Sequence, residues 1–187
     1  MKQLISFLFV ALLLILGCEQ VTEVNDPVKA PQERILNKQL ITLPTSNGLA
    51  VESQTYYQAI DGYYGGEFQK SYTYQTNSGQ VYQYADLDFL PGAFSGTKTI
   101  SMTFNSDGAA MELGPSMVFQ ADVEYTYKIV GVDLTGVNPN TLDFVYIDAI
   151  GNMYAVEYDY VTMDVNSGML KVVNAILPHF SRYGFVN

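Results

Sequence analysis

The side chains that most often carry out covalent or metal chemistry are scarce in this sequence of 187 residues, which has one cysteine, Cys18, and one histidine, His179. A single cysteine cannot form an internal disulfide or a cysteine-rich zinc site, and a single histidine cannot supply a catalytic metal site of two or three histidines. The sequence also lacks a glycine-rich phosphate loop and a Gly-x-Ser-x-Gly nucleophile motif. We therefore expect a protein that is not an enzyme and that has no cofactor.

Carboxylates are the remaining candidates for metal binding. Asp86 and Asp88 are two residues apart, so on a strand they would share one face, and with Asp148 or Asp159 they could bind Ca²⁺ through oxygen. The loop motif of an EF-hand is missing, and such carboxylates most often solubilise an acidic surface, so we expect no metal site. A carboxylate pair for glycoside hydrolysis could also meet in space, but the small size and the absence of tryptophan disfavour a hydrolase.

Tyrosines are abundant, with fifteen in the chain, and four of them form two pairs around a turn. Tyr72 and Tyr74 precede the turn Asn77-Ser78-Gly79, and Tyr82 and Tyr84 follow it, each pair at the two-residue period of a strand. We predict a single cross-strand ladder of these four rings. If the ladder is exposed, it could bind sugar rings or a protein partner, because tyrosine has a flat apolar face and a polar hydroxyl. If it is buried, it is part of the core.

The charge balance limits the partners. Nineteen acidic residues against nine basic ones give a formal net charge of -10. A field of this sign repels polyanions, so nucleic acid is not an expected partner. The hydrophobic content of 48% is typical of a globular protein, and the many aromatic residues favour β-structure.

The first residues have the pattern of a processing signal. One lysine precedes an apolar run over residues 4–16, which as a helix would be about 20 Å long. That length is short of the roughly 30 Å hydrocarbon core of a bilayer. Residues 1–17 therefore fit a signal peptide and not a membrane span.

The end of this run, Ile15-Leu16-Gly17-Cys18, resembles the bacterial lipobox. The resemblance implies cleavage after Gly17, a covalent lipid on Cys18, and a membrane partner reached through that anchor. Glu19 follows the cysteine in place of the aspartate linked with inner-membrane retention, so we expect the outer membrane of a bacterial cell envelope. A buried free thiol is the alternative for Cys18, but its place directly behind the apolar run favours lipidation.

The rest of the chain divides into a tether and a domain. Residues 18–49 are predicted to be the lipidated cysteine and a tether, because proline, asparagine and glycine interrupt any regular element. A short helix over residues 32–40 fits the spacing of their apolar residues, and Pro44 would end it. Residues 50–187 are predicted to form one all-β domain, a two-layer antiparallel β-sandwich, because strand signals recur about every ten residues.

Alternation of apolar and polar residues indicates strands with one buried face. The apolar positions are Ile100, Met102 and Phe104, then Val123, Tyr125, Tyr127 and Ile129, then Leu170, Val172 and Ile176. Four segments rich in asparagine, serine and glycine are predicted to close hairpins. They are residues 77–79, 106–108, 150–152 and 166–168.

Three segments of this domain resemble the ZU-five domain, a β-sandwich module of ankyrins, netrin receptors and zonula occludens proteins with variants in secreted bacterial proteins. They are Leu90-Pro91-Gly92-Ala93-Phe94, then Leu113-Gly114-Pro115-Ser116 with Phe119, and the C-terminal run from Leu177 to Tyr183. The resemblance covers the chain from about Gln80 onwards. It implies a ZU-five-like β-sandwich, although the tyrosine-rich segment before it has no counterpart.

Some proteins with this module cut themselves between the phenylalanine and the serine of a His-Phe-Ser step, which here corresponds to His179, Phe180 and Ser181. The resemblance would make Ser181 the nucleophile that attacks the preceding carbonyl and His179 the base. The alternative is structural. Phe180 would fill the core, His179 and Ser181 would hydrogen-bond at the end of the sandwich, and Tyr183 would pack with its hydroxyl satisfied.

The sequence thus predicts a lipid-anchored protein of the cell envelope whose β-sandwich is a non-catalytic binding or structural module. Two alternatives stay open. One is a self-cleaving ZU-five-like domain, and the other is an accessory lipoprotein that binds carbohydrate through the tyrosine-rich hairpin. The expected partner beyond the membrane is an envelope protein or a glycan.

Overall fold

A single long strand shows how the alternating pattern folds. β7, Val118–Val130, buries all four apolar residues of the pattern and turns the polar residues between them outwards. The computed structural model describes residues 34–35, 37–44 and 53–187, and these ranges are all-β without a helix. Accordingly, the described ranges contain no helix that could cross a membrane.

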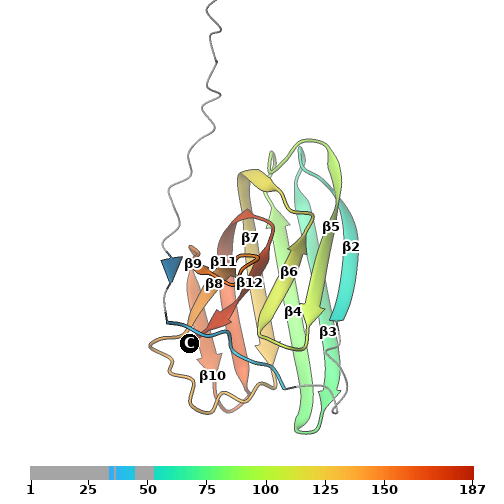
Figure 1. Cartoon of the computed structure of the whole chain (residues 1–187). Coiled ribbons are helices and arrows are strands. Elements are labelled where there is room, and N and C mark those ends of the chain that lie inside the picture. The colour runs from blue at the N-terminus through green and yellow to red at the C-terminus, as the bar shows by residue number, and fades with distance from the viewer. Residues whose placement is uncertain (1–33, 36, 45–52) are drawn as a thin grey trace, which may run out of the picture. The chain divides into compact units, whose positions relative to one another are not determined.

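The strands form two antiparallel sheets that pack face to face, which confirms the predicted β-sandwich (Figure 1). The seven-stranded sheet has the order β1-β9-β8-β12-β6-β5-β2, and the five-stranded sheet has the order β10-β11-β7-β4-β3. The remaining strands are β1 Arg34–Ile35, β2 Ser53–Asp61, β3 Gly66–Thr76, β4 Gly79–Phe89, β5 Thr97–Asn105, β6 Ala110–Gly114, β8 Asp143–Ile147, β9 Met153–Ala155, β10 Tyr160–Asp164, β11 Met169–His179 and β12 Arg182–Val186.

All four predicted hairpins are present. Residues 77–78 join β3 to β4, and residues 106–109 join β5 to β6. The turns at 148–152 and 165–168 join β8 to β9 and β10 to β11. Gly79 and Gly168 have positive φ, a backbone conformation that side chains with a Cβ rarely adopt.

The predicted face of β11 is correct in its first half and wrong in its second. Leu170 and Val172 are completely buried, but Ile176 is only half-buried, while Ala175 and Leu177 take the inward positions. The register against β7 shifts between Val172 and Ala175. A β-bulge inserts one extra residue, so the side chains from Ala175 to Leu177 change face, before the register shifts again between Leu177 and His179.

A segment before β2 belongs to the sandwich, which begins earlier than the predicted boundary at residue 50. Ile41 and Leu43 are buried in the core. The amide of Ile41 donates a hydrogen bond to the carbonyl of Phe185, and the carbonyl of Ile41 accepts one from the amide of Ala109. Residues 37–44, the strap from here on, are therefore held by backbone bonds on both sides. The remaining residues of the predicted tether, apart from 34 and 35, lie outside the described ranges, as does Cys18.

The helix predicted over residues 32–40 is wrong in the part that the structure describes. Arg34 and Ile35 pair with β9, and Leu40 forms an isolated bridge with Val186. Asn37 has a φ of 63°, which is incompatible with a continuing right-handed helix.

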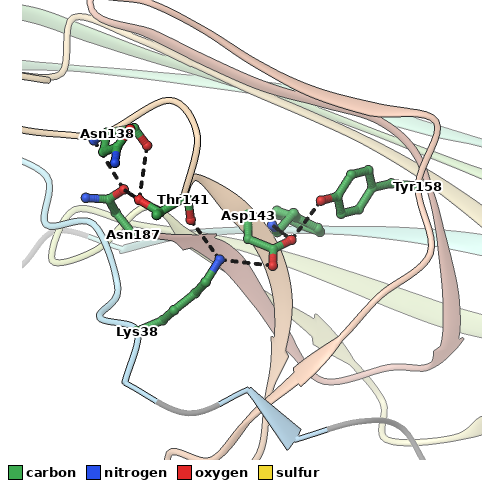
Figure 2. Close-up of polar contacts among 7 residues, drawn as sticks. Lys38, Asn138, Thr141, Asp143, Tyr158 and Asn187 are labelled. Atoms are coloured by element: carbon green, nitrogen blue, oxygen red, sulfur yellow. Dashed lines mark hydrogen bonds and ion pairs between the residues drawn. The ribbon is translucent and has the colours of Figure 1, made fainter.

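Side chains fasten the strap to the other end of the chain (Figure 2). The Lys38 ammonium lies 3.1 Å from a carboxylate oxygen of Asp143 and donates to the carbonyl of Thr141 at 2.7 Å. The other Asp143 oxygen accepts a 2.8 Å bond from the Tyr158 hydroxyl, whose pKa is raised to about 12 by burial and by that carboxylate. The side-chain oxygen of Asn187, one residue beyond β12, accepts a bond from the Thr141 hydroxyl. Asp143 thereby joins the strap to β8 and to the segment before β10.

Candidate functional site

The five-stranded sheet has one face in the core and a second, outer face in solvent. Residues directly opposite one another in the antiparallel register lie in rows across the strands. One such row, the basic row, crosses all five strands. It consists of Ser71, Tyr84, Lys128, Lys171 and Thr162.

A shallow depression of about 300 Å³ lies on this row. It is lined by Tyr82 and Tyr84 of β4, Thr126 and Lys128 of β7, and Lys171 of β11. All five side chains are half-buried, so each presents part of its surface to solvent. The depression combines two aromatic rings with a hydroxyl and two ammonium groups, a set that can stack on a ring and donate hydrogen bonds.

The single ladder of four tyrosines is not formed. In the β3–β4 register, Tyr72 is opposite Gln83 and Tyr74 is opposite Val81, both of which face the core. Tyr74 is accordingly buried, with its ring stacked 5.6 Å from that of Tyr72.

Tyr82 and Tyr84 lie on the outer face instead, opposite Thr73 and Ser71. The turn has two residues, Asn77 and Ser78, so Thr76 pairs with Gly79. With that loop length an even-numbered residue is always opposite an odd-numbered one, which separates the two tyrosine pairs by the thickness of the sheet.

A row of carboxylates crosses the same outer face. Glu67, Asp88 and Glu124 are directly opposite one another on β3, β4 and β7. This acidic row lies four residues along β4 from the basic row, or about 13 Å at the usual rise of a strand. The outer face therefore has a basic end and an acidic end.

Asp86 lies between the two rows, and a hydrogen bond from β3 holds its carboxylate. One carboxylate oxygen accepts a 3.0 Å bond from the Gln69 amide and a 3.4 Å bond from the Tyr84 hydroxyl. Burial, followed by the charge of Glu67, raises the pKa of Asp86. Burial and the charge of Asp86 likewise raise the pKa of Tyr84, so both groups keep their protons more strongly than in free solution.

The carboxylates considered for Ca²⁺ do not gather at one place. Asp86 and Asp88 share the outer face, as expected for residues two apart. Asp148 lies in the β8–β9 turn of the other sheet. Burial would raise its pKa, but the hydrogen bonds that it accepts from Asn152, the Ile150 amide and Tyr154 outweigh burial, and the net shift is downwards. Asp159 accepts a 2.8 Å bond from the Asn174 amide. Within the described ranges, no three histidine, cysteine, aspartate or glutamate side chains are placed to hold a metal ion.

His179, Phe180 and Ser181 lie where the chain passes from the five-stranded sheet to the seven-stranded one. β11 ends at His179 and β12 begins at Arg182. Phe180 is buried in the core, as the structural alternative predicts. The buried Tyr183 donates a 2.6 Å hydrogen bond from its hydroxyl to the carbonyl of His179, and the Ser181 carbonyl accepts one from the Leu113 amide.

The His179 ring packs edge-on against Tyr146, with the ring centroids 4.5 Å apart. The contacts of His179, Ser181 and Tyr183 thus close this end of the sandwich. Neither Phe180 nor Ser181 has a positive φ.

The three segments quoted for the ZU-five resemblance meet in one aromatic cluster. Phe94, Phe119 and Phe180 each pack edge-on against Phe89, with centroid separations of 5.9, 6.4 and 6.0 Å. Phe119 and Phe180 also pack against each other at 4.8 Å. Residues far apart in the sequence therefore fill one end of the core.

A second exposed aromatic group lies at the β2–β3 turn. Tyr63 and Tyr64 are 71% and 74% exposed, and their rings meet edge-on at 4.9 Å. With Pro91 and Gly92 of the β4–β5 loop they line a second shallow hollow. This group lacks charged side chains in its lining, which distinguishes it from the depression on the outer face.

Sequence reasoning missed Thr126, Lys128 and Lys171 as candidate site residues. The alternating pattern of β7 and β11 turns all three outwards, and that much can be read from the sequence. Their proximity to Tyr82 and Tyr84 depends on the pairing of β4 with β7 and of β7 with β11, which periodicity does not specify.

Known proteins offer no assignment for these residues. In the comparisons, no family model, no curated protein and no solved structure matches the chain.

Proposed function

We propose that this chain is a lipid-anchored protein of the bacterial cell envelope whose β-sandwich binds a saccharide without changing it chemically. The observation that carries the binding half is the outer-face depression, where Tyr82 and Tyr84 stand beside Thr126, Lys128 and Lys171. Sugar rings stack on aromatic faces, and their hydroxyls accept and donate hydrogen bonds. The anchoring half rests on Cys18, the only cysteine, at the end of the apolar N-terminal run.

A sheet face suits this task. The strands β4, β7 and β11 that carry these side chains are paired on both sides, so their backbone is already ordered before a ligand binds. The depression is open and shallow, which fits a segment of an extended polymer better than a small molecule enclosed on all sides. An outer-membrane anchor would keep such a domain close to extracellular or periplasmic polysaccharide.

The binding half is tested with the full chain in detergent on an oligosaccharide array. Tyr82→Ala and Tyr84→Ala should each weaken binding about tenfold, because one stacked ring is lost. The matched control is Tyr57→Ala, which removes a tyrosine that is 68% exposed on β2 of the other sheet. Equal affinities for all three variants, or no binding by the parent chain, would contradict a saccharide site at this place.

The anchoring half is tested by fractionating bacteria that express the chain. The parent protein should be in the membrane fraction with a mass that starts at an acylated Cys18. Cys18→Ala should remain unacylated and leave the washed membrane fraction, because two or more acyl chains supply the stable attachment. A parent protein without any acyl group would refute the anchor and leave the saccharide site untouched.

A further inference from the structure

Two lysines face each other on the floor of the depression. Lys128 of β7 and Lys171 of β11 are directly opposite in the register, which puts the Cβ atoms of such a pair about 4.5–5.5 Å apart. Like charges in that position destabilise a sheet. Neither lysine has a carboxylate partner within 4.0 Å among the residues that the structure describes. The chain has nineteen acidic residues against nine basic ones. An acidic residue opposite either lysine would have avoided this repulsion.

Two carboxylates of the outer face lie one row from this pair, and both accept hydrogen bonds from other groups. Asp164 of β10, one row from Lys171, accepts bonds from the Asn166 amide and the Ser167 hydroxyl. Asp86 pairs with Thr126, one row from Lys128, and accepts hydrogen bonds from Gln69 on β3 and from Tyr84 on its own strand. The two ammonium groups are therefore left to solvent or to a ligand. A bound anion between them would relieve their repulsion and accept charge-assisted hydrogen bonds.

The acidic row limits how much negative charge the ligand can carry. Glu67, Asp88 and Glu124 lie about 13 Å from the basic row, a distance of two or three sugar rings. An extended chain with a charge on every ring would place carboxylates against this row and be repelled. The net charge of -10 opposes a polyanion or an anionic membrane as well, since the Debye length of about 8 Å leaves nearby charges only partly screened.

We infer that the outer face selects a saccharide with one anionic sugar among uncharged ones, the anionic group sitting between Lys128 and Lys171 with a ring on Tyr82 or Tyr84. This inference rests on the proposed saccharide-binding function and adds its specificity. The anionic group is a carboxylate, as in a uronic acid, or a sulfate ester. Both accept hydrogen bonds from ammonium groups, and the test distinguishes them.

The test uses the full chain in detergent and four sets of probes. They are neutral oligosaccharides, the same compounds with one glucose replaced by glucuronate, the same compounds with one sulfate ester, and oligogalacturonates with a charge on every ring. Binding to one or both singly charged sets should be at least about tenfold tighter than to the neutral set, the gain expected of a charge-assisted hydrogen bond. The oligogalacturonates should bind more weakly than the singly charged set.

Variants of the two lysines test whether the preference for charged probes arises at this pair. Lys128→Gln and Lys171→Gln should each abolish most of the preference for the singly charged probes, measured as the ratio of their affinity to the affinity for the neutral probes. Lys98→Gln changes the net charge by the same amount on the other sheet. It should alter neither the preference for charged probes nor the affinity for neutral ones. Melting temperatures provide a second readout. Lys128→Gln should melt at the same temperature as the parent or higher, because it removes a like-charge pair.

Each other outcome has its own meaning. Equal binding of neutral and singly charged probes would overturn the charge specificity and leave the saccharide function standing. Tightest binding to oligogalacturonates would overturn the restriction to one charge. Failure of every probe would overturn the proposed saccharide binding and this inference together.

Discussion

On the outer face, the carboxylate of Asp86 occupies a position that costs folding stability. One of its oxygens accepts bonds from Gln69 and Tyr84, whereas the other is buried without a hydrogen-bond partner among the described residues. Burial, then the charges of Glu67 and Asp88, raise its pKa. A buried acceptor without a donor costs stability, and such costs are tolerated most often where a surface has a task other than folding.

The sign of this shift gives a pH-dependent prediction. A raised pKa means that the folded state binds the proton more tightly than the unfolded state, in which the pKa of an aspartate lies near its ordinary value of 3.8. The contribution of Asp86 is therefore most favourable below that pH and is lost as the pH rises through the folded pKa. Asp86→Asn should raise the free energy of unfolding at pH 7 by less than about 1 kcal/mol, because solvent screens a half-buried carboxylate. The gain should shrink towards pH 3.

Urea denaturation at pH 7 and pH 3 measures the difference. The control is Asp88→Asn, an exposed carboxylate two residues along the same face, for which the gain should be smaller. If Asp86→Asn were the less stable protein at pH 7, the bonds from Gln69 and Tyr84 would outweigh burial, and the direction of the shift would be wrong.

The buried side chain of Gln83 is expected to contribute to the stability of the fold through its two hydrogen bonds. Its side chain is completely buried, accepts a 2.5 Å bond from the Tyr127 hydroxyl, and donates a 2.9 Å bond to the carbonyl of Asn105. Asn105 ends β5, so this amide links the two sheets through the core. Gln83→Leu should lower the free energy of unfolding by about 2–4 kcal/mol, because a buried donor and a buried acceptor both lose their partner.

A double variant separates hydrogen bonding from packing. Adding Tyr127→Phe to Gln83→Leu removes the orphaned hydroxyl and should recover about 1 kcal/mol or more in urea denaturation. No recovery would mean that the loss comes from the altered shape of the core and not from the hydroxyl.

Individual elements show what the sequence could and could not predict. The all-β class, three of the strands with the buried faces of two of them, and the four hairpins follow from local signals, namely a two-residue period and turns rich in glycine and asparagine. The faces of the tyrosines did not follow, because a turn of two residues in place of three exchanges the two sides of the hairpin. Ile176 was misplaced for a related reason, the extra residue of the bulge near Asn174.

The candidate site was harder to predict than the strands. Tyr82 and Tyr84 could be singled out from their spacing, but Lys128 and Lys171 lie about 45 and 90 residues away in the sequence and become neighbours only through the strand order of the sheet. Strand order is set by contacts between distant segments, for which the pattern within each strand has no signal. The strap was missed because its two buried residues are too few to show a period.

The strap itself is a testable element. Ile41 is 8% exposed, belongs to the core cluster, and lies between backbone partners on both sides. Ile41→Ala should lower the free energy of unfolding by about 2–4 kcal/mol, the usual cost of such a truncation in a core. If residues 37–44 were only a tether, the same change would cost nothing measurable. Val118→Ala, at a side chain that is 74% exposed, is the control and should stay within about 0.5 kcal/mol of the parent.

At the scale of the whole molecule, the two ends of the described sandwich are fastened to each other. The strap pairs with β12 and is clamped by Lys38 and Asp143, and Asn187 bonds with the backbone of Gln39 and the side chain of Thr141. Any pull that an anchor at Cys18 exerts on the domain would therefore enter through a segment bonded to the strand β12. Among the described residues, these contacts of the strap do not involve the outer face of the five-stranded sheet.

The pairing of β12 with its two neighbouring strands determines how self-cleavage has to be measured. β12 lies between β8 and β6, with backbone pairing on both sides, so residues 181–187 would stay bound even after a cut between Phe180 and Ser181. Only a mass measured under denaturing conditions can show the cut. We expect one species that ends at Asn187, because the buried Phe180 and the Tyr183 bond to His179 make this corner a closed end of the core. A seven-residue fragment that disappears in Ser181→Ala would instead establish Ser181 as a nucleophile.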